Sequence, residues 1–177
     1  IDEGVTYTKT NYPDSIIANS LACTSTGTIF VGTIRKGVYR STDNGASYAP
    51  TAPLAATKSI TSLLVAANGT IYAGTDGDGL FQSANNGDAW TLVTNDVTMN
   101  NIECLHQDKN GVLYAGTNYG VYRSKDDGKT WQEILNTGTG SSGVKSVLVS
   151  AKEQKIYAGV QGDGVYYSAD NGESWTQ

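Results

Sequence analysis

The sequence predicts an all-β protein, a β-propeller with four four-stranded blades plus the outer strand of a preceding blade. Three observations predict this fold. A Ser-x-Asp-x-Gly-x-x-aromatic motif, with Asn in place of Asp in one copy, recurs four times in 177 residues, with its serines at positions 41, 83, 124 and 168. Short segments of β-branched and aromatic residues between Asn-Gly and Asp-x-Gly turns are typical of β-hairpins. A period of about 42 residues with four strands per repeat matches a propeller blade.

The third repeat shows the expected order of strands within a blade. Residues 102–107 form the first, innermost strand, and a tight turn leads into the second strand at 112–117. The third strand covers 121–124, and the motif then turns into the fourth, outermost strand at about 130–134. We call these strands A, B, C and D from the inside outwards. No stretch has a 3.6-residue apolar period of useful length, so no helix is expected.

The same pattern divides the whole chain. We expect one propeller segment over 1–177, with the outer strand of a preceding blade at 1–10 and blades at 16–52, 58–94, 100–136 and 143–177. The chain opens inside a further copy of the motif, because Asp2 precedes Asp43 by one period. We therefore expect part of a ring of six to eight blades, since four blades is the lower limit for a closed propeller. Exposed blade faces would associate with missing blades of the same chain or with a second copy.

Charge and hydropathy exclude two classes of function. The chain has 12 Lys and Arg against 17 Asp and Glu, a net charge of −5. This balance argues against a nucleic-acid partner, which would need a basic face. The longest apolar run, Leu63 to Ala67, is far below the roughly 20 residues of a membrane-spanning helix.

The four motifs carry a family resemblance. In each copy the Asp or Asn side chain can accept backbone N–H bonds across the turn, and the Gly two residues later can take a positive φ. The motif resembles the repeat of the Asp-box (BNR) family, within the sialidase- and xyloglucanase-like propeller superfamily. The residues at its Asp, Gly and Trp positions are Asp2, Asp43, Asn85, Asp126, Asp170, Gly45, Gly87, Gly128, Gly172, Tyr48, Trp90, Trp131 and Trp175. Asn85 and Tyr48 depart from the consensus Asp and Trp. The resemblance implies that the box is structural and lies away from any catalytic face.

Ligand-binding residues are expected on the opposite face, where the B–C loops and the D–A connections lie. Loops on a rigid scaffold commonly carry function, although these could also be plain solvated loops. The candidates are Arg35, Lys36, Asp76, Asp78, Asn118, Tyr119, Gln161, Asp163 and Tyr12. Tyr119 in a B–C loop is the first candidate for stacking on a sugar, and Tyr12 in a D–A connection is the second.

Catalytic residues are not predicted in this segment. A sialidase needs three converging arginines, whereas Arg40 and Arg123 share one slot on strand C and are interpreted as blade-surface residues. A glycosidase needs two carboxylates roughly 5 to 9.5 Å apart. Asp78 and Asp163 share a Gly-Asp-Gly turn slot, which favours a turn role, so catalysis is left open but not favoured.

No cofactor and no metal site are expected. His106 is the only histidine, and repeat alignment gives it a core or channel-lining position. Cys23 and Cys104 occupy non-equivalent slots in separate repeats, so free thiols are favoured over a disulfide.

The sequence thus favours a non-catalytic module that is secreted, surface-exposed or periplasmic and binds a protein or glycan ligand. We expect a location outside the cytoplasm because the chain has few charged residues and many Thr, Ser, Asn and Gly residues. The resemblance implies two alternatives. The second candidate is part of a sialidase-like or xyloglucanase-like glycoside hydrolase. The third is an assembly factor of a membrane complex, because the family includes photosystem assembly factors.

Overall fold

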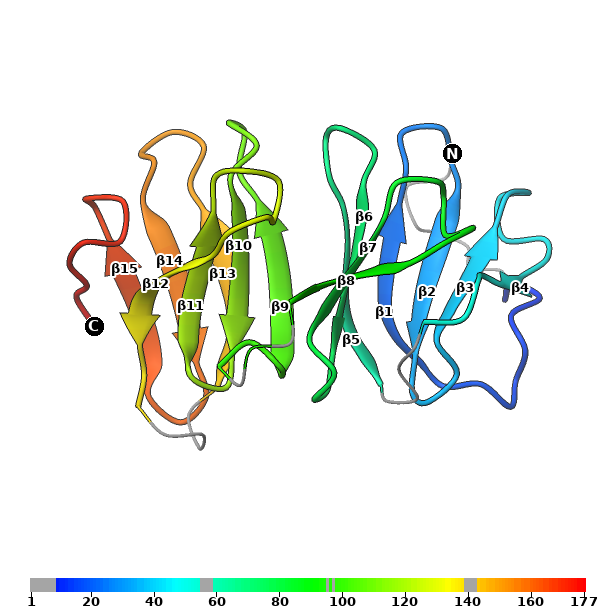
Figure 1. Ribbon diagram of the computed structural model, residues 1–177, viewed down its shortest axis with the longest axis horizontal. Coiled ribbons are helices and arrows are strands. Elements are labelled where there is room, and N and C mark those ends of the chain that lie inside the picture. Colours follow the sequence, from blue (N-terminus) through cyan, green and yellow to red (C-terminus); the bar gives the residue numbers. More distant parts are fainter. Residues whose placement is uncertain (1–8, 55–58, 95, 97, 139–142) are drawn as a thin grey trace.

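The computed structural model confirms an all-β propeller fold (Figure 1). It describes residues 9–54, 59–94, 96, 98–138 and 143–177, and within these ranges all regular secondary structure is β, so no helix there could span a membrane. The strands are β1 (Ala18–Cys23), β2 (Ile29–Thr33), β3 (Val38–Ser41), β4 (Ala49–Pro50), β5 (Ile60–Val65), β6 (Ile71–Thr75), β7 (Leu80–Ser83), β8 (Thr91–Thr94), β9 (Ile102–Gln107), β10 (Leu113–Thr117), β11 (Gly120–Ser124), β12 (Gln132–Asn136), β13 (Val144–Val149), β14 (Ile156–Val160) and β15 (Gly164–Ser168).

Each blade is an antiparallel sheet whose strands follow chain order. Blades 1, 2 and 3 consist of β1–β4, β5–β8 and β9–β12. Blade 4 differs from the prediction of four strands: it contains β13–β15, and a single bridge between Tyr167 and Thr176 marks the place of strand D. The predicted outer strand at 1–10 falls largely outside the described residues, which begin at Lys9.

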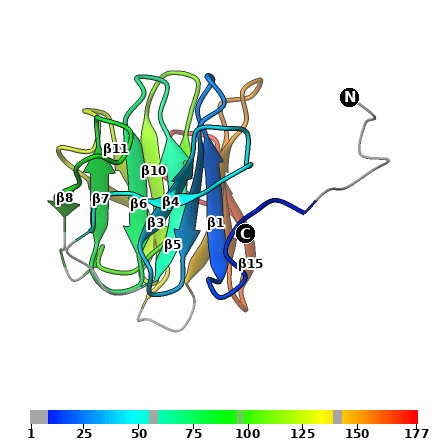
Figure 2. The same cartoon turned by 90° about the vertical axis from the view of Figure 1, so that its right-hand side faces the viewer.

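The blades pack face to face, and the apolar core lies between them (Figures 1 and 2). Phe30 and Val38 of blade 1 join Ile60 and Leu63 of blade 2 in the first of three buried clusters. The other two clusters lie between blades 2 and 3 and between blades 3 and 4. Stability therefore depends on contacts between consecutive repeats, as expected for a repeat protein.

A glycine in strand B lets consecutive blades approach closely. A Cβ added at Gly74 would lie 2.6 Å from Cγ2 of Ile102, on the inner strand of the next blade. Ile102 itself is fully buried. The glycine of strand B in blades 1 to 3 therefore serves packing between blades.

The inner strands are also joined by polar contacts at one repeated position. Nδ2 of Asn19 donates to the Ile60 carbonyl oxygen at 2.9 Å. Thr61 occupies the same position in blade 2 and bonds to the Ile102 carbonyl oxygen. In blades 3 and 4 the equivalent residues, Glu103 and Lys145, form an ion pair at 2.7 Å.

Candidate functional site

The structure places the B–C loops and the described parts of the D–A connections on one face of the blade row, which we call the loop face. The A–B turns and the Ser-x-Asp-x-Gly turns lie on the opposite side, the box face (Figure 1). This division follows from antiparallel pairing, because successive strands end at alternate edges of the sheet.

Each of the first three B–C loops is held by a buried threonine at the end of strand B. Oγ1 of Thr33 donates to the Gly37 carbonyl oxygen at 2.7 Å and accepts the Lys36 N–H at 3.0 Å. Thr75 makes the same pair of bonds, to the Gly79 carbonyl oxygen and from the Asp78 N–H. The pattern recurs at Thr117. The threonine hydroxyl therefore holds each of these loops through the loop's own backbone groups.

The predicted ligand-binding residues divide into exposed and half-buried groups. Exposed on the loop face are Arg35, Lys36, Asp76, Gln161 and Asp163, and half-buried are Asp78, Asn118 and Tyr119. The structure does not gather them into one cluster. Asp76 and Asp78 share a loop of blade 2, whereas Asp163 belongs to blade 4, and its carboxylate accepts the Tyr166 hydroxyl at 2.6 Å. The face is a row of separate loops.

Tyr12 is engaged with its own neighbours. Its ring meets Tyr48 and Tyr39 edge-on, with centroids 5.3 and 6.1 Å away. Burial raises the pKa of its hydroxyl, which is buried and has no hydrogen-bond partner among the residues that the structure describes. The ring is therefore not a free platform, and Tyr119 is the remaining stacking candidate on this face.

Metal chemistry receives no support from the part of the chain that is described. It contains no group of three or more His, Cys, Asp or Glu side chains that could hold an ion. Cys23 and Cys104 are free thiols, as predicted. His106 lies half-buried on an inner strand, where its Nε2 accepts the Val149 N–H at 3.3 Å and burial lowers its pKa.

A hollow on the box face was not predicted from the sequence. Its volume is about 470 Å³, and it is lined by the A–B turns of blades 1 and 2, from Cys23 to Thr26 and from Val65 to Ala67. Hydroxyl and methyl groups dominate this lining. The sequence gives no signal for it, because the hollow depends on how two turns from separate repeats are spaced.

The box turns share one hydrogen-bond network. In blade 1, Oγ of Ser41 donates to Oδ1 of Asp43 at 2.8 Å and accepts the Gly45 N–H at 2.9 Å. Oδ1 of Asp43 also accepts the Ser47 N–H at 2.9 Å, and Oδ2 accepts the Ser47 hydroxyl. Asn44, between the acid and the glycine, has a φ of 57°. Blades 3 and 4 repeat these bonds.

Blade 2 changes two positions of the network together. Asn85 replaces the acid, and Ala89 replaces the hydroxyl residue four positions later. Oδ1 of Asn85 still accepts the Ala89 N–H at 2.9 Å and the Ser83 hydroxyl at 2.9 Å. Asn85 lacks the second carboxylate oxygen, and Ala89 lacks the hydroxyl that bonds to this oxygen in the other boxes. No group is therefore left without its partner, and the turn keeps its shape.

The three acidic boxes predict a loss of stability in acid. Hydrogen bonds from the hydroxyls of Ser47, Thr130 and Ser174, then from their N–H groups, lower the pKa of Asp43, Asp126 and Asp170 from 3.8 to about 2. These carboxylates stabilise the folded state fully above the unfolded pKa, and that contribution is lost as pH falls towards 2. The free energy of unfolding, measured in urea, should decline steeply between pH 4 and pH 2. The decline should be shallower in the variant D43N/D126N/D170N. Equal declines in the unchanged chain and in the variant would mean that these three carboxylates do not cause the loss of stability.

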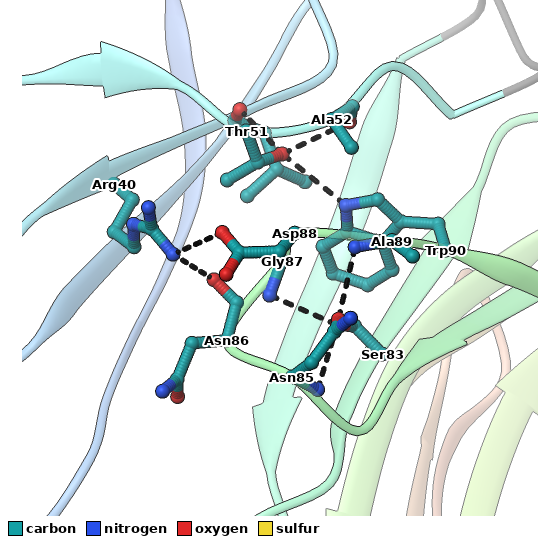
Figure 3. A network of polar contacts seen from close by, with 11 residues as sticks. Arg40, Thr51, Ala52, Ser83, Asn85, Asn86, Gly87, Asp88, Ala89 and Trp90 are labelled. Carbon is teal, nitrogen blue, oxygen red and sulfur yellow. Dashed lines mark hydrogen bonds and ion pairs between the residues drawn. The ribbon is translucent and has the colours of Figure 1, made fainter.

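The boxes of blades 2 to 4 also contact the preceding blade, and Figure 3 shows the contact between blades 1 and 2. Nη1 of Arg40 in blade 1 donates to the Asn86 carbonyl oxygen at 2.6 Å and to Asp88 at 2.9 Å. Nε1 of Trp90 donates to Oγ1 of Thr51 at 3.2 Å, on the outer edge of blade 1. Arg40 is partly exposed at the blade surface, and its guanidinium also joins two blades, a role that the sequence did not predict.

The contact recurs along the row with different donors. The Tyr72 hydroxyl donates to the Asp127 carbonyl oxygen of the next box at 2.9 Å, and Arg123 donates to the Asn171 carbonyl oxygen. Nε1 of Trp175 likewise reaches back to the Ile134 carbonyl oxygen at 2.6 Å. Arg40 and Arg123 occupy the same position of strand C in blades 1 and 3, and this recurrence was the sequence signal for the contacts between blades.

We expect Arg40→Ala to cost more stability than Asp88→Ala. The pair is partly exposed, with side-chain exposures of 30% and 65%, so loss of the ion pair alone should cost below about 1 kcal/mol. Arg40 additionally donates to a backbone carbonyl, and a charged hydrogen bond adds about 1.5 kcal/mol or more. Urea unfolding of both single variants measures the difference, and equal costs would mean that the carbonyl contact contributes nothing.

Comparisons with known proteins agree with this fold. A family model for the DUF6242 beta propeller domain matches residues 80–177. No curated protein matches the chain. Among solved structures, an ancestral GH74 enzyme is 26% identical, with a TM-score of 0.74 over 90% of this chain and 25% of its own. The chain thus spans about a quarter of that enzyme's length.

Two further solved structures share the fold at lower identity. The extracellular domain of a candidate one component system from B. thetaiotaomicron is 23% identical, with a TM-score of 0.68 over 90% of this chain and 22% of its own. YCF48 bound to D1 peptide is 18% identical, with a TM-score of 0.67 over 98% of this chain and 57% of its own.

Proposed function

We propose that this chain, which belongs to the DUF6242 beta propeller domain family, is a non-catalytic interaction module that binds a protein or glycan on its loop face. We place it outside the cytoplasm, as a secreted, surface-exposed or periplasmic module. Its likeness to the extracellular domain of a one component system supports this location. The serine, aspartate and hydroxyl bonds of its boxes support assigning the repeat to the Asp-box type.

The threonine-held B–C loops are the observation that carries this proposal. Thr33, Thr75 and Thr117 each fix a loop, and the side chains of these loops are exposed or half-buried. A binding surface that is already ordered loses little conformational entropy when a ligand is bound. The boxes, by contrast, use their polar groups on one another and on the preceding blade.

The side chains of the loop face vary in charge from blade to blade. Arg35 and Lys36 give blade 1 a basic loop, and Asp76 and Asp78 give blade 2 an acidic one. Blade 3 contributes Tyr119, whose half-buried ring can stack on an apolar sugar face. An extended ligand crossing several blades would meet each of these loops in turn.

Glycan and peptide arrays probed with the labelled 177-residue chain test this proposal and identify the ligand class. We expect a small set of glycans or peptides to be bound. Tyr119→Ala should reduce glycan binding at least tenfold, because stacking is lost, and should affect a charged peptide much less. Arrays without binding would overturn the proposal, as would binding that no loop-face substitution weakens.

Part of a glycoside hydrolase is the second candidate, favoured by the 26% identity to the GH74 enzyme over 90% of this chain. The carboxylates to test are Asp76, Asp78 and Asp163, on the loops of blades 2 and 4. Hydrolysis of xyloglucan or aryl glycosides above the level of the variant D76A/D78A/D163A would establish catalysis and replace the first proposal. A role as an assembly factor of a membrane complex, the third candidate, predicts peptide binding on the arrays, as in the peptide-bound YCF48 structure.

A further inference from the structure

A second, smaller hollow lies between blades 3 and 4 and opens on the box face. Its volume is about 160 Å³, whereas pockets for drug-sized ligands measure about 300–1,000 Å³. It is lined by Asp108 and Asn110 of the blade 3 A–B turn, by Tyr114 and Arg123 of strands B and C, and by the box of blade 4 at Asn171. We call it the junction hollow. It has room for one small group, not for an extended chain.

Tyr114 brings a buried hydroxyl to the wall of the junction hollow. The residue is 4% exposed. In blade 2 the equivalent Tyr72 donates its hydroxyl to the Asp127 carbonyl oxygen of the next box at 2.9 Å. In blade 3 the matching carbonyl oxygen, that of Asn171, accepts from Arg123 instead, and the Tyr114 hydroxyl has no hydrogen-bond partner among the described residues. Because buried polar groups are normally hydrogen-bonded, this hydroxyl is available to a ligand.

Two cations line the same hollow, and neither forms an ion pair within the part of the chain that the structure describes. Arg40, the blade 1 equivalent of Arg123, pairs with Asp88 at 2.9 Å. Arg123 instead bonds to a backbone carbonyl oxygen and to Oε1 of Gln132 at 3.0 Å, which are neutral groups. Lys125 is exposed, at a position where the other boxes have threonine or alanine. The blade 3 side of the hollow therefore has two positive charges, which favour an anionic ligand.

The A–B turn of blade 3 adds a carboxylate that is already held in place. Oδ1 of Asp108 accepts the N–H groups of Asn110 and Val112 at 2.9 Å each. These bonds use one of the two carboxylate oxygens, so the other can accept a hydroxyl group of a ligand. Nδ2 of Asn110 donates to Oε1 of Gln154 at 3.3 Å, which links the A–B turns of the two blades. This wall thus offers a fixed acceptor and amide groups.

The charges of the two walls meet at the tyrosine. Burial raises the pKa of Tyr114, the Asp108 carboxylate raises it further, and the Arg123 guanidinium opposes the rise. Both charged groups therefore act on the same hydroxyl. Val112 and Val149 complete the lining with apolar surface. A ligand that fits this wall carries an anionic group, hydroxyl groups and a small apolar face.

We propose that the junction hollow binds a single acidic sugar, a uronic acid, whose carboxylate is held by Arg123, Lys125 and the Tyr114 hydroxyl. Charge-assisted hydrogen bonds from guanidinium and ammonium groups are the strong contacts that a carboxylate finds in proteins. The hydroxyl groups of the sugar then face Asp108, and the C–H groups of its ring face the two valines. The site lies on the face opposite the loop face and goes beyond the proposed function, because its ligand is one sugar held between two blades.

An NMR titration of the isotope-labelled 177-residue chain with D-glucuronate tests the proposal. We expect the backbone signals of Asn110, Gln154 and Asn171 to shift and to saturate. Glucose has the same ring without the carboxylate and should bind at least about tenfold more weakly, because it forms no charge-assisted hydrogen bond. Glycerate, a hydroxy acid without a ring, should also bind more weakly, since it leaves the two valines uncovered.

Variants assign the binding to the hollow. Lys125→Ala and Tyr114→Phe should each weaken glucuronate binding severalfold. Lys129→Ala is the matched control, because it removes an exposed lysine of the same box that does not line the junction hollow, and it should leave the affinity unchanged. Arg123 is left intact because it joins two blades. Circular dichroism checks that Tyr114→Phe, a change in the core, leaves the chain folded.

Four results would overturn the proposal. They are the lack of a saturable shift, equal affinity for glucuronate and glucose, equal affinity for glucuronate and glycerate, and equal weakening by Lys125→Ala and Lys129→Ala. The loop-face variant K36A/D76A should bind glucuronate as the unchanged chain does. Failure of this site therefore leaves the proposed function of the loop face untouched, and the two proposals are tested separately.

Discussion

Gly120→Ala is expected to destabilise the protein by more than about 3 kcal/mol, because the added methyl group overlaps backbone. Gly120 begins β11 and pairs with Asn136. A Cβ at this position would overlap the Leu135 carbonyl oxygen and approach Cα of Asn136 to 3.2 Å. No rotamer change can relieve that contact, so strands C and D of blade 3 must separate. Urea unfolding measures the loss.

Gly69→Ala is the control for Gly120→Ala. Gly69 has a φ of 84°, but no atom lies within 4 Å of an added Cβ. Only the torsional cost remains, about 1–2 kcal/mol for a non-glycine residue in left-handed backbone. Equal losses in the two variants would mean that the close approach of strands C and D does not set the requirement for Gly120.

Ile102→Ala is expected to cost about 2–5 kcal/mol, the usual range for truncating a buried aliphatic side chain. Ile102 is fully buried between blades 2 and 3, against Gly74 of the preceding blade. The rigid strands on both sides cannot collapse into the cavity. Leu92→Ala truncates a side chain that is 49% exposed, so it should cost well below about 1 kcal/mol. A small loss for Ile102→Ala would contradict a core formed between the blades.

The strands and box turns could be predicted from sequence because local chemistry repeated in phase determines them. Ser41, Asp43 and Gly45 lie within one turn, and each bond among them spans four residues or fewer. Four copies of that turn, each after three short β segments, leave few folds other than a propeller. The division into a loop face and a box face then follows from strand alternation.

The contacts between blades could not be predicted in the same way, because they join residues of separate repeats. Arg40 bonds to Asn86 and Asp88, which lie 46 and 48 residues later, and nothing local marks those partners. Tyr12 was predicted as a stacking platform from its place between repeats. Its edge contacts with Tyr39 and Tyr48 depend on how the chain folds back over blade 1.

The sequence predicted which loops form the candidate site but not how these loops are arranged in space. Sequence alignment of the repeats identified Asp76, Asp78 and Asp163 as loop residues, and all three lie on the loop face. The repeats already assigned them to blades 2 and 4, but the distance between these loops depends on the spacing of consecutive blades, which composition and periodicity do not determine. Side-chain pairs such as Tyr166 with Asp163 become visible only in three dimensions.

The central claim, that the protein or glycan of the proposed function binds the loop face and not the box face, is tested most directly by two matched pairs of charge deletions. The measurement is the affinity of the chain for the glycan or peptide found on the arrays. K36A/D76A removes one cation and one anion from the loop face, and K152A/E173A removes one of each from exposed positions on the box face. We predict at least a tenfold weaker affinity for K36A/D76A and an unchanged affinity for K152A/E173A. Binding that survives K36A/D76A and is lost in K152A/E173A would contradict the account.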